Sequence, residues 1–376
     1  MPALRPDIDP DGLLEFSVVF TDRSLNHMSA AFQEVMRDIS SMLREVYNAD
    51  AVALVPGGGT YAMEAVARQF AEDETVMVLR NGYFSYRWSQ IFDAAKLPSH
   101  EHVMMARRVG NDPQAPFQPA PLEEVTARIA AEKPAVVFAP HVETSAGMIL
   151  PDDYIRTVTD AVHAVGGLFV LDCIASGCIW ADMKALGVDV LISAPQKGWS
   201  ASPSAGLVMM SDRARDVAKA RQSSSFAVDL GKWLAIMETY ENGGHAYHAT
   251  LPTDALRGFR DAMVETKALG FEAMKDAQWT QGRKVRAALA ARGFRLVAAD
   301  GFEAPGVVVA FTDDAELQTG KPFMSAGMQV AAGVPLMVGE GDDYRSFRIG
   351  LFGLDKLKDV DASVARFEAA LETVAA

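Results

Sequence analysis

The feature that most restricts the fold of this chain is an alternation of short apolar runs with amphipathic segments over its first two-thirds. Most runs are continuously apolar, as in strands covered on both faces of a sheet. The segments between them, such as 121–133, place apolar residues at helical spacing. This repetition predicts an α/β fold with a mostly parallel, seven-stranded sheet. The runs are 51–56, 75–80, 102–106, 135–140, 168–172, 188–193 and 206–211.

The pattern changes after about residue 250. A long helix-like stretch, 255–290, is followed by short strand candidates and a final helix, which predicts a smaller α+β domain. The strand candidates are 294–298, 306–311 and 344–351, and the helix is 361–374. For a chain of 376 residues we expect an N-terminal segment (1–20), a large domain (21–254) and a small C-terminal domain (255–376).

Charge and cysteine content argue against several classes of protein. The net charge is −14, from 35 Lys and Arg against 49 Asp and Glu, so neither nucleic acid nor a membrane surface is expected as a partner. The N-terminus lacks the basic and apolar parts of a secretory signal, and no apolar run approaches the ~20 residues that span a bilayer. Two Cys form no disulfide framework. We therefore expect a cytoplasmic protein with reduced thiols.

A glycine-rich turn, Val55-Pro56-Gly57-Gly58-Gly59-Thr60, lies between a predicted strand and a predicted helix. Consecutive glycines let the backbone turn tightly, and the helix that follows has partial positive charge at its N-terminus. The turn is neither GxGxxG nor a Walker A motif. It is compatible with a phosphate site, in which the Thr60 hydroxyl would take part, and equally with a plain tight turn.

An acid and an amine follow at the ends of two other predicted strands. Asp172 ends the run 168–172, and Lys197 lies 25 residues further on, just past the run 188–193. Ligands of parallel sheets bind at the carboxyl ends of strands, where the glycine turn also opens. An amine for a Schiff base, a carboxylate for a pyridine nitrogen and a phosphate cup are what pyridoxal phosphate (PLP) requires.

Six segments in the same order resemble the class V aminotransferases of PLP fold type I, and within them the alanine–glyoxylate and serine–pyruvate group. The similarity extends from about residue 45 to the end of the chain. The segments are GGGTYAMEA (57–65), NGYFSYRW (81–88), HVETSAG (141–147), LDCIAS to SAPQK (171–197), YHATLP (247–252) and FRIGLFG (347–353).

The resemblance implies a role for each matching residue. Lys197 would hold the cofactor as a Schiff base, Asp172 would pair with its ring nitrogen, and Arg348 would bind the substrate α-carboxylate. Tyr247 and Thr250 would reach the cofactor phosphate of a second subunit, which implies a homodimer with shared active sites. The remaining cofactor contacts would come from Gly58, Gly59, Thr60 and Gln196 at the phosphate, Phe84 over the ring and Thr144 near its phenolic oxygen.

The activity implied is a ping-pong transfer of an amino group from a small amino acid (alanine, serine, glycine or aspartate type) to a 2-oxo acid such as glyoxylate or pyruvate. Lys197 would act as general base and then general acid. The main alternative on the same fold is a PLP-dependent lyase, by β-elimination or in the manner of a desulfurase. A second alternative, a non-catalytic PLP-binding regulator, is disfavoured because the reactive residues are intact and no DNA-binding module is evident.

Two other groups of residues have less support as sites. His245 and His248, and likewise His141 and Glu143, lack further ligands at metal spacing, so no metal site is expected. A desulfurase needs a nucleophilic Cys on a mobile loop, and the two Cys, 173 and 178, both lie beside Asp172.

One segment departs from the family. Relatives usually have a Gly- and Pro-rich segment near the N-terminus, where this chain has Phe20–His27 (FTDRSLNH). Arg23 in that segment could bind a second acidic group of a substrate, or pair with a neighbouring acid.

Overall fold

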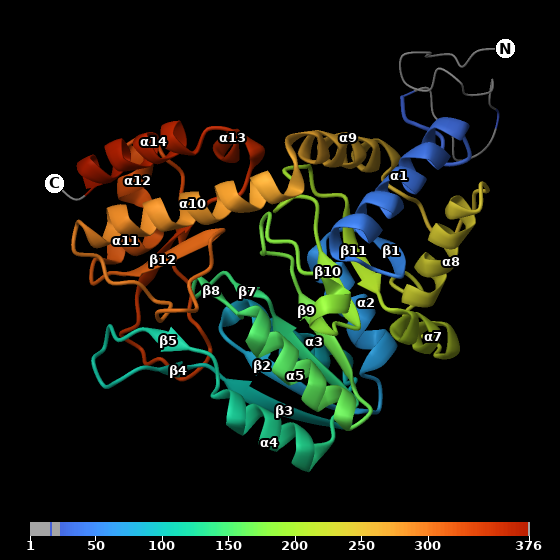
Figure 1. Ribbon diagram of the computed structural model, residues 1–376, viewed down its shortest axis with the longest axis horizontal. Coiled ribbons are helices and arrows are strands. Elements are labelled where there is room, and N and C mark those ends of the chain that lie inside the picture. Colours follow the sequence, from blue (N-terminus) through green and yellow to red (C-terminus); the bar gives the residue numbers. More distant parts are fainter. Residues whose placement is uncertain (1–15, 17–22, 375–376) are drawn as a thin grey trace.

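The computed structural model describes residue 16 and residues 23–374, and its centre is a seven-stranded sheet (Figure 1). Strand β11 pairs antiparallel with β1 and β10, whereas the other neighbouring strands are parallel, which confirms the mostly parallel sheet. In spatial order the strands are β1 (Ala51–Pro56), β11 (Ala205–Met210), β10 (Val190–Ser193), β9 (Leu168–Asp172), β6 (Val136–Pro140), β2 (Thr75–Arg80) and β3 (His100–Met105).

Helices flank this sheet (Figure 1). In α1 the side chains of Phe32, Val35, Met36 and Ile39 are buried at a spacing of three and four residues, and the Ser29 hydroxyl caps the helix. The helices before residue 250 are α1 (Ala30–Tyr47), α2 (Gly59–Phe70), α3 (Tyr83–Ala95), α4 (Leu122–Glu132), α5 (Asp152–Ala164), α6 (Met183–Leu186), α7 (Asp212–Ala220) and α8 (Leu230–Glu241).

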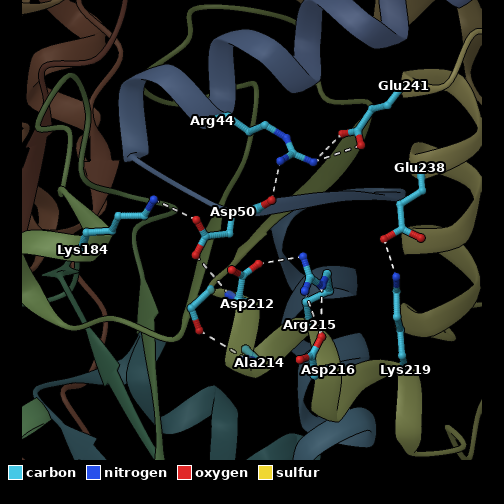
Figure 2. Close-up of polar contacts among 11 residues, drawn as sticks. Arg44, Asp50, Lys184, Asp212, Ala214, Arg215, Asp216, Lys219, Glu238 and Glu241 are labelled. Atoms are coloured by element: carbon cyan, nitrogen blue, oxygen red, sulfur yellow. Dashed lines mark hydrogen bonds and ion pairs between the residues drawn. The ribbon is translucent and has the colours of Figure 1, made fainter.

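Arg44 of α1 joins this helix to α8 and to the sheet (Figure 2). Its Nη2 donates to both carboxylate oxygens of Glu241, at 2.9 and 3.0 Å, and its Nη1 donates to the backbone oxygen of Asp50. The ion pair therefore joins α1 to α8, and the contact with Asp50 joins α1 to the residue that precedes β1.

The C-terminal part contains an antiparallel sheet in the order β12-β14-β13, around which a separate group of apolar side chains is buried. The stretch 255–290 forms two helices, because the chain turns at Gly270 with a φ of +92° that favours glycine. The elements are α9 (Thr253–Leu269), α10 (Phe271–Ala290), β12 (Val307–Phe311), α11 (Ala315–Thr319), α12 (Lys321–Ser325), β13 (Ala331–Ala332), β14 (Ser346–Gly350), α13 (Leu354–Leu357) and α14 (Val360–Val374).

The expected strand at 294–298 does not form. Its backbone forms an isolated bridge to each of two different partners: Leu296 pairs with Ala310 of β12, and Ala298 pairs with Phe117. Phe117 belongs to a hairpin of β4 (Arg107–Arg108) and β5 (Phe117–Gln118), which thus connects the central part of the chain to its C-terminal part. The pairing on each side stays a single bridge, so the segment forms no continuous ladder.

A second short hairpin, β7 (Val142–Glu143) and β8 (Met148–Ile149), follows β6 at the carboxyl edge of the large sheet. Among the described residues, no helix combines the length and apolar character that crossing a bilayer requires. The domain division at 254/255 stays a prediction, since it falls inside the first turn of α9 and α9 packs against α1.

Candidate active site

A cavity opens at the carboxyl edge of the large sheet, where β1, β9 and β10 end. It brings together residues that are far apart in the sequence, among them seven of those proposed above. Its lining consists of Gly59, Thr60, Met63, Phe84, Arg87, Val142, Thr144, Asp172, Ile174, Ala175, Gln196 and Lys197.

The glycine turn forms one wall of this cavity. Gly57 has a φ of +124°, and a Cβ there would lie 2.6 Å from the Tyr61 ring. A Cβ on Gly59 would lie 2.5 Å from Ile174. Gly58 is the N-cap of α2 and gives that helix no side-chain hydrogen bond. Glycine is therefore favoured at 57 and 59, whereas position 58 has room for a Cβ. The turn leaves the helix N-terminus open to an anion.

Asp172 is the last residue of β9, and only 8% of its surface is exposed. Its Oδ1 accepts a 2.9 Å hydrogen bond from the Ile174 N–H. Burial raises the pKa of Asp172 to about 7, and the charge of nearby Glu143 adds to the rise. A cation such as a protonated pyridine nitrogen would favour the ionised carboxylate at this position.

Lys197 lies after β10 and is half-buried, with its Nζ 5.4 Å from the centroid of the Phe352 ring. Burial lowers the pKa of its amine, and the positive charges of Arg348 and Arg87 lower it further. An amine with a lowered pKa has a larger neutral fraction, which is the nucleophilic and basic form.

Arg348 reaches the same region from β14 of the small sheet. Its Nε donates a 2.8 Å hydrogen bond to the Ala332 oxygen, and its Cζ lies 5.5 Å from the centroid of the Phe84 ring. Burial lowers the pKa of this guanidinium, although it stays cationic at neutral pH. The structure thus places a cation from the C-terminal part of the chain beside the aromatic ring that lines the cavity.

Sequence reasoning missed Arg87, which also lines the cavity. Its Nη1 donates a 3.1 Å hydrogen bond to Thr60 Oγ1, and its Cζ lies 5.3 Å from the Phe84 ring centroid. The signal was present in the NGYFSYRW segment, because residues three apart on a helix share a face. Phe84 and Arg87 have that spacing on α3.

Three of the proposed residues lie away from the cavity within one chain. Tyr247 and Thr250 are exposed, their hydroxyls are 3.3 Å apart, and they line a separate surface pocket with His27. Arg23 is exposed and does not line the cavity. The preceding residues of the unusual segment, 20–22, lie outside the described part of the chain.

The histidines and cysteines considered above as possible metal ligands or nucleophiles have surroundings that suit neither role. Burial lowers the pKa of His141 to about 4, and its Nδ1 lies 2.7 Å from Ser176 Oγ. His248 Nε2 lies 2.8 Å from the Phe226 oxygen. Within the described residues, no group of three or more His, Cys, Asp or Glu is placed to hold a metal. Cys173 and Cys178 are buried, and burial raises the pKa of both thiols, that of Cys178 to about 12.

Comparison with known proteins assigns this chain to a family, because the model of the family described as "Aminotransferase class-V" matches residues 15–333. The chain belongs to the class V aminotransferases. Like the other members, this aminotransferase is an enzyme that depends on pyridoxal phosphate, and it has the α/β architecture of fold type I.

Several known proteins resemble this aminotransferase over most of its length. A protein of Synechococcus sp. (strain PCC 6716) named "Soluble hydrogenase, small subunit" is 26% identical, over 92% of this chain and 87% of its own. An "Alanine--glyoxylate aminotransferase" of Felis catus is 28% identical, over 71% and 62%. The crystal structure of an alanine–glyoxylate aminotransferase from Nostoc sp. superposes with a TM-score of 0.79 at 23% identity, covering 93% and 89%.

The chemistry of the cavity fits the cofactor. Its donors near the glycine turn, namely the open N-terminus of α2, the Thr60 hydroxyl and the Arg87 guanidinium, suit a phosphate. The side-chain oxygen of Gln196 is buried and has no hydrogen-bond partner among the described residues, so this amide is available to a bound molecule. Together with the Asp172 carboxylate and the Lys197 amine, these groups match the charged parts of pyridoxal phosphate.

Proposed function

We propose that this aminotransferase moves an amino group from a small amino acid to glyoxylate or pyruvate, and that Lys197, Asp172 and Arg348 perform the reaction. The observation that supports this most directly is that Asp172 and Lys197 line one cavity at the large sheet edge, while Arg348 from the small sheet lies against Phe84, which lines it too. The name of the Felis catus relative supports a small donor and glyoxylate as acceptor.

Each of the three charged side chains has a separate role in the proposed reaction. When bound, pyridoxal phosphate supplies an electrophilic carbon and a ring that accepts electron density. Arg348 binds the substrate carboxylate in two-point geometry and fixes the Cα next to Lys197. The Lys197 Nζ would accept the proton of the substrate Cα as a general base and would then return a proton, as a general acid, to the carbon that the cofactor supplies. Asp172 holds the proton of the ring nitrogen, which keeps the ring electron-poor.

The cofactor-binding residues that remain are part of the same proposal. Gly58, Gly59, Thr60 and Gln196 would hold the phosphate, Phe84 would cover the ring and Thr144 would bond near its phenolic oxygen. All but Gly58 line the cavity, and a Cβ on Gly58 would come within 4.0 Å of the Gln196 amide nitrogen. Arg23, which does not line the cavity of its own chain, is kept as a candidate for a second acidic group of the donor, with pairing to a neighbouring acid as the alternative.

A spectroscopic assay with single donors tests the reaction. The purified enzyme is mixed with alanine, serine, glycine or aspartate alone, and the visible absorbance of the bound cofactor is followed. A transaminase loses that band with one equivalent of oxo acid formed, and regains it with glyoxylate or pyruvate. Continuous release of pyruvate and ammonia without an acceptor would show a lyase instead. Normal turnover by Lys197→Ala would overturn the assignment of the lysine.

The competing reactions have less support in the structure. A desulfurase needs a reactive thiolate, whereas both thiols here are buried with raised pKa values. A hydrogenase, as the Synechococcus relative is named, needs metal centres held by thiolates or similar ligands. The described residues offer no such ligand group.

We further propose that the enzyme is a cytoplasmic homodimer with shared sites. The exposure of Tyr247 and Thr250, away from the cavity of their own chain, supports a contact with a second subunit. A mixture of Lys197→Ala and Tyr247→Ala subunits tests this. Hybrid dimers would have one intact site, so activity should return on mixing. Mixing without any gain would contradict shared sites.

A further inference from the structure

Glu143 is a buried carboxylate beside the cavity that the mechanism above does not use. It ends β7, and none of its surface is exposed. Its Oε1 accepts from the N–H of Phe84 at 3.1 Å and from the N–H and hydroxyl of Ser145, at 3.1 and 2.7 Å. Its Oε2 accepts from the N–H and hydroxyl of Ser85, at 2.9 and 2.7 Å. A buried charge is thus stabilised by five neutral donors.

These contacts fix the first turn of α3. The N–H groups of Tyr83, Phe84 and Ser85 are orphan donors of a helix N-terminus, and Ser145 Oγ accepts the first of them at 2.9 Å. Glu143 accepts the other two, and its negative charge is stabilised by the partial positive charge at the N-terminus of the helix. A Cβ on Gly82 would lie 2.7 Å from Glu143 Cγ, so glycine at the N-cap permits this approach.

Helix α3 also supplies two side chains that line the cavity. The ring of Phe84 belongs to its first turn, and the guanidinium of Arg87 lies one turn further on. The Glu143 charge also acts on the site directly: it raises the pKa of Asp172 and opposes the lowering of the pKa of Arg348. The Glu143 carboxylate is therefore connected to the Phe84 ring through hydrogen bonds, and to Asp172 and Arg348 through its charge.

We propose that Glu143 is a positioning residue: it holds the start of α3 so that Phe84 and Arg87 face the bound cofactor. This inference rests on the proposed placement of the cofactor in the cavity. An amide cannot replace the carboxylate. Whichever way a glutamine is turned, its NH2 would face at least one backbone N–H that now has an acceptor, namely that of Ser85 or those of Phe84 and Ser145, and would leave it unpaired.

The test compares Glu143→Gln with wild type and with Glu340→Gln. Glu340 is a matched control, since its carboxylate also accepts several backbone N–H groups (Leu336, Met337 and Val338), but in a loop that does not line the cavity. Three quantities are measured on the full chain: the melting temperature without cofactor, the Kd for pyridoxal phosphate, and the visible circular dichroism of the bound cofactor, which reports its orientation.

For Glu143→Gln we expect a Kd for pyridoxal phosphate raised roughly ten- to a hundred-fold, by analogy with residues that orient metal ligands, and altered visible dichroism. Glu340→Gln should change neither. If Glu143→Gln lowers only the melting temperature and leaves both cofactor signals at wild-type values, the residue is merely structural and the proposal is wrong.

Should Glu143→Gln fail to fold, Ser85→Ala and Ser145→Ala answer the same question, because each removes one hydroxyl donor to Glu143 and leaves the charge. Each also removes the acceptor of a backbone N–H at the start of α3, which loosens the same turn. Each variant should raise the Kd for pyridoxal phosphate several-fold. If both variants keep the wild-type Kd and visible dichroism, the proposal is wrong. Failure of the wild-type chain to bind pyridoxal phosphate at this lysine would instead refute the proposed function itself, so the two outcomes are separable.

Discussion

Arg87 donates a 3.1 Å hydrogen bond from its Nη1 to the hydroxyl oxygen of Thr60, and so joins helix α3 to the glycine turn at the start of α2. The contact places a fixed cation next to the helix N-terminus that suits a phosphate. The same guanidinium lies against the Phe84 ring and contributes to the lowered pKa of Lys197. One side chain thus connects the proposed phosphate site, the ring site and the reactive amine.

Replacing Arg87 by Gln should weaken binding of the cofactor. A charge-assisted hydrogen bond is worth about 1.5–3 kcal/mol, so we expect the Kd for pyridoxal phosphate to rise roughly ten- to a hundred-fold. Quenching of protein fluorescence during titration of the cofactor-free enzyme measures this. Arg107→Gln is the control, because Arg107 pairs with Glu124 on the surface. Equal affinities of the two variants would exclude a phosphate role for Arg87.

The Asp172 carboxyl should make the cofactor-free protein less stable as pH rises. Its pKa is about 7 in the folded chain against 3.8 ordinarily, so between these values the folded state binds a proton that the unfolded state has released. The free energy of unfolding contributed by this group therefore falls with rising pH. In urea unfolding, the free energy of unfolding of Asp172→Asn relative to that of wild type should increase by roughly 2–4 kcal/mol between pH 4 and pH 8. A constant difference would contradict the raised pKa.

His141 should act in the opposite direction. Burial lowers its pKa from 6.5 to about 4, so the unfolded chain takes up a proton on acidification before the folded chain does. Its contribution to stability is present above pH 6.5 and is lost as pH falls toward 4. We expect His141→Asn, which keeps a polar group near Ser176, to lose less stability than wild type over that interval. The same unfolding series measures it, and parallel curves would be the contrary result.

The ion pair between Arg44 and Glu241 should contribute more to stability than a neighbouring pair in the same region (Figure 2). Arg44 binds both oxygens of Glu241 and is half-buried, whereas Lys219 meets Glu238 through one 2.6 Å contact. We expect Arg44→Met to lower the free energy of unfolding by about 1–2 kcal/mol and Lys219→Met by less than about 0.5. Thermal or urea unfolding compares them, and equal losses would show that the two-point geometry adds nothing.

The strands of the large sheet and the edge at which the site lies were predictable from the sequence. Continuous apolar runs mark strands buried on both faces, and Asp172 and Lys197 follow two of them. Parallel strands bring their carboxyl ends to one edge whatever the intervening helices are. The fold and the family therefore follow from local patterns and their order along the chain.

Where local patterns misled, a non-local contact or a single backbone conformation was responsible. The segment 294–298 has the composition of a strand, yet its backbone bonds to β12 on one side and to Phe117 on the other. The helical pattern of 255–290 continues through Gly270, although the chain turns there. The spacing of apolar residues indicates neither which segments 294–298 bonds to nor the positive φ of Gly270.

By itself, the sequence determined the order of the elements and placed Asp172 at the end of one strand and Lys197 just after another, because each depends on a short stretch of chain. Only the tertiary structure decided that Arg87 meets Thr60, that Arg348 lies against Phe84, and that Glu143 holds the first turn of α3. These relationships join segments separated by tens or hundreds of residues. They arise when packing buries polar groups together and requires each to find a partner.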